Sequence, residues 1–170
     1  MNSSDEIVDA DDIAILKTSC VSFNRFDSSE RKRVVDREVR LVACPVVKDC
    51  IIVSRMNTPD RVGACGISTD DLPNLFLPDR LWRLRLEDGF DPYLVYVALA
   101  TDVRQARIRG IASGTSGSMH NVPQGAFLDI ELELPLSLKE QQLIGAFFQK
   151  LDSLIALHQR ERFRALLDET

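Results

Sequence analysis

The spacing of apolar residues divides the chain into an N-terminal part with strand-like patterns and a C-terminal part with helical ones. Between positions 13 and 68, short apolar runs rich in β-branched residues are interrupted by proline, glycine and asparagine, a pattern typical of strands. These runs cover 13–18, 37–47, 49–55 and 61–68. The polar segment 24–33 is predicted to be a loop or a short turn.

Strict alternation of apolar and charged residues predicts two further strands. In 79–87, "DRLWRLRLE", three apolar side chains alternate with Arg83 and Arg85. We expect a half-buried strand with solvated arginines, and the alternative is a strand whose arginines face DNA. In 127–135, "FLDIELELP", leucine and isoleucine alternate with acidic residues, which predicts a strand with one buried and one acidic face.

Two later segments have the helical period. The first begins at Asp91, a good capping residue, continues with Pro92, which suits a first helical turn, and ends near 110. The second follows Ser137 and Glu140, which have capping-box spacing, and continues for around 30 residues, or about 45 Å. This length exceeds what a domain of this size needs. We therefore expect the helix to project and pair with another helix, and the alternative is a plain core helix.

The apolar residues of this last helix fall on one wide face. His158 interrupts the apolar stripe, and we interpret it as a polar position in a helix–helix contact that sets the register. The predicted interface residues are Ile144, Phe147, Phe148, Leu151, Leu154, Ile155 and His158.

Length and composition indicate one globule with an appended element. The chain has 170 residues, of which 45% are hydrophobic and 28% charged, enough for a single core. We predict a mixed α+β fold, with a twisted sheet and a few helices in 13–135 and a long helix in 136–170. The acidic segment 1–12 is predicted to be a disordered arm.

The net charge of −5 is concentrated at the N-terminus, where five acidic residues precede the first basic one, Lys17. The rest of the chain is balanced, and 16 of the 21 basic residues are arginine, whose planar fork suits phosphates and guanine edges. This charge distribution neither requires nor forbids nucleic-acid binding. The sequence has no apolar run long enough to cross a membrane and no signal-peptide pattern, so we expect a cytoplasmic protein without membrane contact.

The motifs of catalysis and cofactor binding are absent from the sequence. The glycine loop around 110–121 has no lysine after its glycines and leads to a proline, which excludes a P-loop, and it lacks the dinucleotide fingerprint. Four cysteines without C-x-x-C spacing are expected to be reduced, mostly buried thiols. We therefore expect no catalytic residues, no metal site and no cofactor in this chain.

Two loops combine the residue types that contact DNA. "SRMNTPDRVG" (54–63) and "GTSGSMHNV" (114–122) carry arginine, asparagine and small hydroxyl residues, which suit phosphate oxygens and base edges. Taken alone, each would be an ordinary turn, and His120 would be an ordinary polar loop residue. The predicted DNA-binding residues are Arg55, Asn57, Thr58, Arg61, Thr115, Ser116, Ser118 and His120.

Together, several stretches resemble one half of a specificity subunit of a type I restriction–modification enzyme. They are "CIIVSRMNTPDRVG", "YLVYVAL", "GTSGSMHNV" and "IELELPLSLKEQQLIGAFFQKLDSLIALHQRE". The last carries the most weight, because its P-x-x-x-x-E-Q run and the helix after it resemble the helix that follows each target recognition domain in that family. The resemblance covers roughly residues 13–165.

The resemblance implies a non-catalytic protein that reads duplex DNA. Residues 13–135 would form a target recognition domain, and 136–170 a spacer and dimerisation helix that docks a modification subunit. S-adenosylmethionine, ATP and Mg²⁺ would be bound only by the modification and restriction subunits. Since such subunits usually carry two recognition domains and two antiparallel helices, this chain is expected to form a homodimer or to pair with another specificity fragment. The alternative is a truncated fragment or a helical interaction module without DNA activity.

Overall fold

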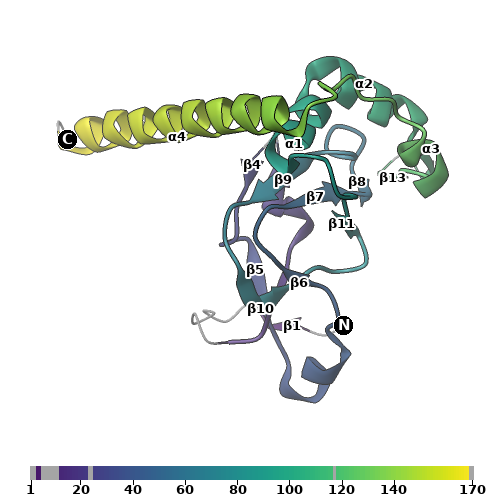
Figure 1. Ribbon diagram of the computed structural model, residues 1–170. Helices are drawn as coiled ribbons and strands as arrows, with labels where there is room; N and C mark the ends of the chain where they lie inside the picture. Colours follow the sequence, from purple (N-terminus) through teal and green to yellow (C-terminus); the bar gives the residue numbers. More distant parts are fainter. Residues whose placement is uncertain (1–2, 5–11, 23–24, 117, 169–170) are drawn as a thin grey trace.

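A globule of small sheets and short helices carries one long projecting helix, α4 (Leu138–Asp168) (Figure 1). This computed structural model describes residues 3–4, 12–22, 25–116 and 118–168. The architecture is the mixed α+β class with a long C-terminal helix that the sequence predicts.

The largest sheet lies at the end of the globule remote from α4 (Figure 1). Its strands, in spatial order, are β1 (Ser3–Ser4), β5 (Arg31–Val34), β2 (Ala14–Leu16), β10 (Leu72–Phe76) and β6 (Pro45–Val46). Strands β2 and β10 are parallel, and the other neighbours are antiparallel. Alternate residues of β2, Ala14 and Leu16, are buried in a core that this sheet shares with the next one.

A three-stranded antiparallel sheet forms the centre of the globule, with β7 (Cys50–Ser54) between β11 (Leu81–Leu84) and β9 (Cys65–Ser68). Every residue of β7 is buried, which explains its continuous apolar sequence. Helix α1 (Pro92–Ala100) packs on this sheet and contributes to a second core. The sheet therefore separates two hydrophobic clusters and gives the neighbouring loops a rigid support.

Short elements complete the described fold. A three-stranded sheet has the order β12-β13-β8, and β3 pairs with β4. The bounds are β3 (Val21–Ser22), β4 (Arg25–Phe26), β8 (Met56–Asn57), β12 (Ser113–Ser116), β13 (Met119–Asn121), the 3-10 helices η1 (Thr18–Cys20) and η2 (Asp36–Leu41), and the helices α2 (Asp102–Ile111) and α3 (Gln124–Leu128).

The first turns of α4 are fixed to the N-terminus of α1. Gln141 is 2% exposed, and its side chain accepts a hydrogen bond from the Asp91 N–H (3.0 Å) and donates to the Pro135 carbonyl (2.8 Å). Three turns further along, the Tyr93 hydroxyl donates to the Asp152 carboxylate (2.8 Å). These bonds set the direction in which α4 leaves the globule.

Predicted helix starts agree with the structure. The Asp91 carboxylate accepts from the Leu94 N–H (2.9 Å) as an N-cap, and Pro92 is the first residue of α1. At α4, the Glu140 N–H donates to the Ser137 hydroxyl (3.4 Å), as the capping-box spacing indicates. The strand predicted within 79–87 is β11.

Three predicted elements between residues 24 and 110 are wrong in part. The single helix predicted over 91–110 is broken at Thr101, whose extended backbone separates α1 from α2. The polar loop 24–33 contains β4 and most of β5, and the strand 37–47 is instead η2 followed by the short β6.

The strand predicted at 127–135 does not form. Residues 124–128 are helix α3, and residues 130–135 have no regular secondary structure. Ile130, Leu132 and Leu134 still pack on the second core, so the alternation specifies burial although no neighbouring strand pairs with this segment.

Part of the predicted disordered arm is ordered. Within segment 1–12, Ser3–Ser4 pair with β5, and the Asp12 carboxylate lies 3.4 Å from the Arg33 guanidinium. The other residues of the arm, 1–2 and 5–11, lie outside the described part of the chain.

The thiol prediction is confirmed. All four cysteines are free, with Cys44 half-buried and Cys20, Cys50 and Cys65 buried. Among the described residues, no helix is long and apolar enough to cross a membrane.

Candidate nucleic-acid interface

The two loops that the sequence singles out are joined by the pairing of β8 with β13. Asn57 lies opposite His120, and Met56 lies opposite Asn121. The ladder is extended by the Val122 N–H, which donates to the Arg55 carbonyl (2.8 Å). Segments about sixty residues apart in the sequence thus form one continuous edge at the end of the globule opposite to the direction of α4 (Figure 1).

The glycine-rich stretch is a tight hairpin of β12 and β13 and not an open phosphate loop. A Cβ atom at Gly114 would lie 2.8 Å from Cδ2 of the His120 ring, so the close approach of the two strands requires glycine here. Ser118 in the turn is exposed, and His120 is half-buried. The side chains of Thr115 and Ser116, both predicted to contact DNA, lie outside the described part of the structure.

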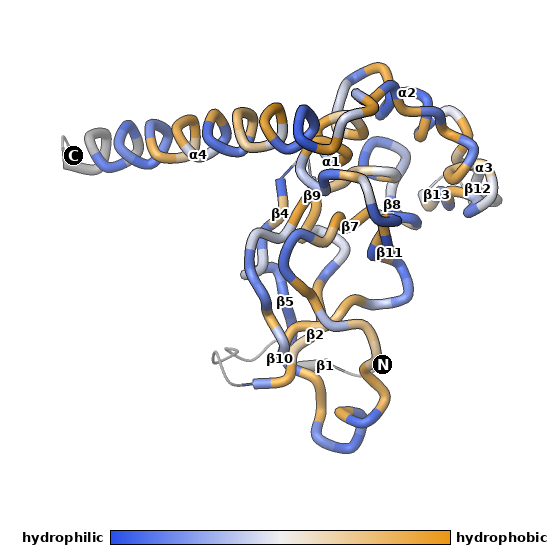
Figure 2. Tube along the Cα trace, viewed as in Figure 1, coloured by the Kyte–Doolittle hydropathy of each residue, from blue (hydrophilic) through white to orange (hydrophobic). Residues whose placement is uncertain are grey.

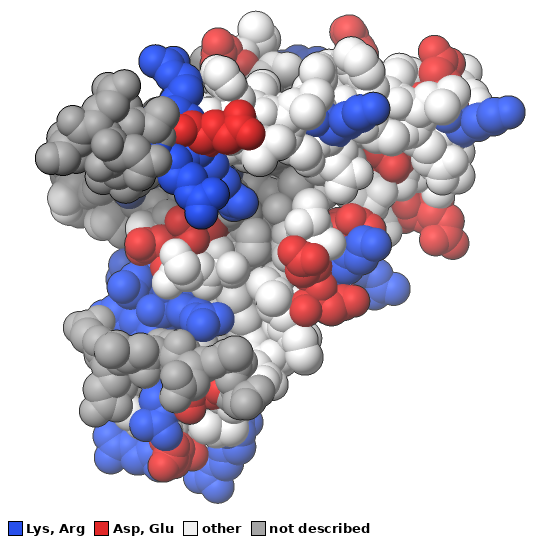
Figure 3. Space-filling model, turned by 90° about the vertical axis from the view of Figure 1, so that its left-hand side faces the viewer, with Lys and Arg blue, Asp and Glu red and all other residues white. Residues whose placement is uncertain are grey.

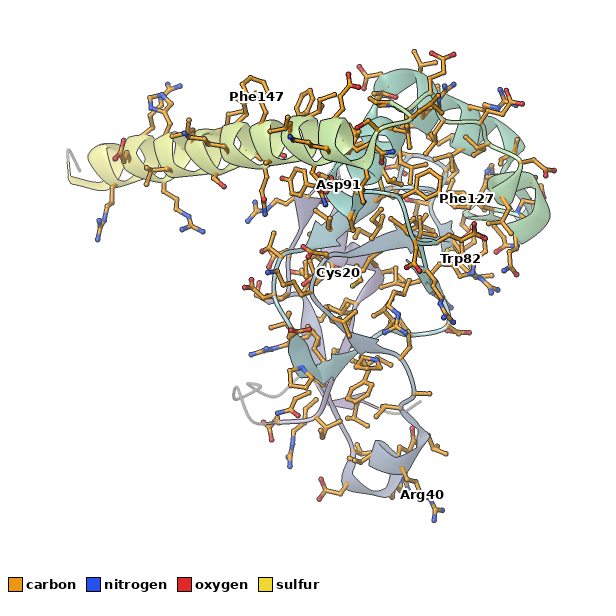
Figure 4. The ribbon with its side chains drawn as sticks, in the orientation of Figure 1. Cys20, Arg40, Trp82, Asp91, Phe127 and Phe147 are labelled. Atoms are coloured by element: carbon orange, nitrogen blue, oxygen red, sulfur yellow. The ribbon has the colours of Figure 1, made fainter. Side chains whose placement is uncertain are left out.

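Arg55 is positioned through both its backbone and its side chain. Its N–H donates to the Arg80 carbonyl (3.0 Å), while its own carbonyl accepts from Val122, so its backbone is held from both sides. The guanidinium carbon lies 5.9 Å from the centre of the Trp82 ring, within the range of a cation–π contact. Trp82 in turn packs against Phe127 at 5.5 Å between ring centres (Figure 4).

One atom of Arg55 has unused hydrogen-bonding capacity. Its Nε is buried without a hydrogen-bond partner among the described residues, and the same holds for Oδ1 of Asn121. Since buried polar groups normally have a partner, the Arg55 Nε–H can donate one further hydrogen bond and the Asn121 Oδ1 can accept one. Asn121 and Trp82 were not among the predicted site residues. No sequence signal identified Asn121, whereas the alternation in 79–87 placed Trp82 on the buried face.

Asn57 supports the fold and does not present its amide at the surface. Its Nδ2 donates to the Ser54 hydroxyl (3.0 Å) and to the Thr18 carbonyl (3.4 Å), and its Oδ1 accepts from the Thr58 N–H (2.9 Å). The residue is 8% exposed. With its amide committed to these bonds, Asn57 is left out of the interface that we propose below.

Thr58 and Arg61 lie on an exposed turn next to this edge. The Arg61 N–H donates to the Thr58 carbonyl (3.0 Å), which closes the turn. Asp60 lies in the same turn, and the hydrogen bond from the Thr58 side chain lowers the pKa of its carboxyl group. The turn therefore carries one acidic side chain, Asp60, and one basic side chain, Arg61. It is not a strongly basic patch, so a ligand would be bound here through individual side chains.

Charges of both signs are also mixed on a larger scale. On the face drawn in Figure 3, basic and acidic side chains lie next to one another. Because the charges are mixed, the surface has no strong net electrostatic potential. A partner would therefore be recognised by a few individual side chains more than by long-range electrostatic attraction.

The predicted helix interface is mostly exposed, as an unpaired contact face would be. Phe147 is 60% exposed and projects from the side of α4 that faces away from the globule (Figure 4). Leu154, Ile155 and His158 are also exposed, Phe148 and Leu151 are each 36% exposed, and Ile144 is half-buried. Figure 2 shows apolar and polar residues recurring along α4 well beyond its contact with α1.

No family model matches this chain, and no curated protein matches it. Among the described residues there is no group of three or more histidine, cysteine or acidic side chains placed to hold a metal ion.

Proposed function

We propose that this protein is a DNA-recognition module, one half of a specificity subunit of a type I restriction–modification system. The observation that carries the proposal is the β8–β13 pairing, which joins two loops of DNA-contacting residue types and fixes Arg55 over Trp82. The projecting helix α4, with its exposed apolar face, suits the spacer and docking helix that the resemblance implies.

In this proposal Arg55 is the base-reading residue. A guanidinium held on an aromatic ring loses little conformational freedom on binding, and its fork suits the O6 and N7 acceptors of guanine. The exposed residues Thr58, Arg61 and Ser118 would contact phosphate oxygens and set the register on the duplex.

The chain would do no chemistry itself. A modification subunit with S-adenosylmethionine would methylate adenine, and a restriction subunit would use ATP and Mg²⁺. The protein would work in the cytoplasm with these subunits, and a second recognition half would be supplied through α4.

The second candidate function is a helical interaction module without DNA activity. It is favoured by one observation, the exposed apolar face of α4, which needs a protein partner whether or not the globule binds DNA.

The decisive experiment is selection of bound sequences from randomised duplexes, followed by affinity measurements over a range of salt concentrations. We expect an enriched sequence containing guanine, a loss of sequence preference in Arg55→Ala that Arg55→Lys does not restore, and a roughly uniform loss of affinity in Arg61→Ala. Arg109→Ala, an exposed arginine of α2, is the matched control and should bind like the wild type. If no DNA sequence is enriched, either with this protein alone or with a type I modification subunit added, the interaction module without DNA activity is the remaining function.

A further inference from the structure

The segment 130–134, between α3 and α4, has the burial pattern of a strand but no strand beside it. Its apolar side chains pack on the second core and its acidic ones are exposed: Ile130, Leu132 and Leu134 on one side, Glu131 and Glu133 on the other. Side chains that alternate in this way point to opposite sides of the chain, as they do in a strand. The segment belongs to no sheet of the described structure and runs as a simple coil from α3 to the start of α4 (Figure 1).

The backbone of this segment has unused hydrogen-bonding capacity. Among the described residues, the N–H and carbonyl groups of 131–134 have no hydrogen-bond partner. Just outside them, the Ile130 N–H donates to the Phe127 carbonyl (3.2 Å), and the Pro135 carbonyl accepts from the Gln141 side chain (2.8 Å). Because a backbone polar group shut away from water without a partner is costly, we expect these free groups to face solvent. The segment is thus held at both ends and offers an open strand edge between them.

The outward side of this edge is acidic. Asp129, Glu131 and Glu133 are exposed, and none of them forms an ion pair with a described residue. A strand added to the edge would place side chains directly opposite the two glutamates, where opposite charges attract and like charges repel. The acidic side therefore disfavours nucleic acid and favours a strand with lysine or arginine at alternate positions.

Exposed leucines lie at both ends of the segment. Leu128, in the last turn of α3, is 70% exposed, and Leu136, just before α4, is fully exposed. A protein segment with apolar residues between its basic ones can cover such leucines, whereas a small cation bound to the glutamates cannot. The free backbone, the acidic side and the exposed leucines are therefore all matched by one kind of ligand, an extended chain in which basic and apolar residues alternate.

We propose that residues 130–134 bind an extended segment of a partner protein by strand addition, with basic residues of that segment opposite Glu131 and Glu133. In this mode of recognition, main-chain hydrogen bonds supply the affinity and the pattern of alternate side chains supplies the specificity. Since the segment leads into α4, the bound strand lies at the base of that helix. The inference uses neither the β8–β13 edge nor the free face of α4, so it does not rest on the proposed function.

The test is binding of a fluorescent peptide with the sequence Lys-Val-Lys-Val-Lys-Val to the full chain without DNA. We expect saturable binding, together with slower hydrogen exchange of the 131–134 amides in the complex. Two control peptides should bind more weakly by about tenfold or more, because strand addition needs both the backbone N–H groups and the alternation. One has three lysines followed by three valines, and the other is the alternating peptide with methylated backbone nitrogens.

Charge reversal in the chain gives a matched pair of variants. Glu131→Lys/Glu133→Lys should raise the dissociation constant of the Lys-Val peptide about tenfold and bind the alternating Glu-Val peptide, which the wild type should not bind. Asp79→Lys/Glu161→Lys makes the same change of charge at exposed positions elsewhere and should bind like the wild type. Equal melting temperatures of the two variants check that both are folded.

Several results would overturn the inference. Equal binding of the alternating and the methylated peptide would show attraction to an acidic surface without strand addition. Unchanged affinity in Glu131→Lys/Glu133→Lys, slow exchange of the 131–134 amides in the free protein, or no binding of the Lys-Val peptide would each contradict it as well. Because no DNA is present, these results leave the proposed function unaffected, and a failed selection of DNA sequences leaves the peptide site unaffected.

Discussion

The Asp91 carboxylate lies directly over Gly145 where α1 and α4 cross, and there is no room for a side chain at position 145. A Cβ atom there would lie 3.0 Å from Cγ of Asp91 and 3.3 Å from the Leu94 nitrogen, the two ends of the α1 cap. This glycine lets α4 approach the capped end of α1 closely enough for Gln141 and Asp152 to make their hydrogen bonds.

Gly145→Ala is therefore expected to destabilise the protein, although alanine favours helix by up to about 1 kcal/mol over glycine. The added methyl group displaces the Asp91 cap, which costs roughly 1 kcal/mol, and also loosens the contact between α1 and α4. Gly110→Ala is the matched control, because Gly110 lies in α2 with open space around it. Denaturant unfolding should show a lower free energy of unfolding for Gly145→Ala and a higher one for Gly110→Ala. An equal increase in both variants would contradict the close approach of α4 to α1 at Gly145.

Asn57→Ala is expected to destabilise the fold more than it affects DNA contacts. The change leaves the buried Ser54 hydroxyl without the Asn57 amide and removes the acceptor for the Thr58 N–H. An unpaired buried polar group costs about 1–3 kcal/mol. Thr58→Ala, in the exposed turn next to it, should change thermal stability little. If Asn57→Ala melts like the wild type but loses sequence preference, Asn57 reads bases after all.

Thiol reactivity should follow burial. Burial raises the pKa of the Cys20 and Cys65 thiols from 9.0 to about 12, so that both remain protonated at pH 8. A short exposure of the native protein to iodoacetamide, read by peptide mass analysis, should modify the half-buried Cys44 before either of them. Modification of Cys65 at the rate seen in urea would contradict this packing.

The same two thiols predict how stability changes in alkali. Their folded pKa is higher than that of the unfolded chain, so their stabilising effect is complete below pH 9.0 and is lost as pH rises toward about 12. Burial also raises the pKa of Tyr93 and Tyr96, with the same sign. The free energy of unfolding should therefore fall steadily above pH 9, and a flat profile between pH 9 and 11 would contradict the burial of these groups.

The sequence could predict features that depend on neighbours along the chain. The Asp91 cap, the Ser137 hydroxyl that accepts from the Glu140 N–H and the length of α4 all arise from local spacing, and the structure confirms them. The break at Thr101 could not be predicted, because the chain there is held by packing: Gln105, at the start of α2, donates to the Leu99 carbonyl of α1 (3.0 Å).

The candidate site depends on contacts between distant segments, which a single sequence does not reveal. Residue types alone singled out Arg55 and Asn57 equally. Only the tertiary structure separates them, since Ser54 and Thr18 bind the Asn57 amide while Trp82 supports the Arg55 guanidinium. For 127–135, alternation correctly indicated that Ile130, Leu132 and Leu134 pack on the core. It was wrong for Leu128, which is 70% exposed because residues 124–128 form helix α3, and it could not show that no neighbouring strand pairs with the segment.

Trp82 offers a direct signal for the proposed interface, because it is the only tryptophan in the chain. Its ring lies against both the Arg55 guanidinium and Phe127, so any ligand that engages Arg55 changes the surroundings of the indole. We expect titration with the selected duplex to shift or quench the tryptophan emission, and Arg55→Ala to alter the emission of the free protein and abolish the DNA-dependent change. Arg109→Ala should keep both signals. Binding of DNA at full affinity with unchanged emission would place the reading residues away from Arg55 and move the interface toward the exposed turn at Thr58 and Arg61.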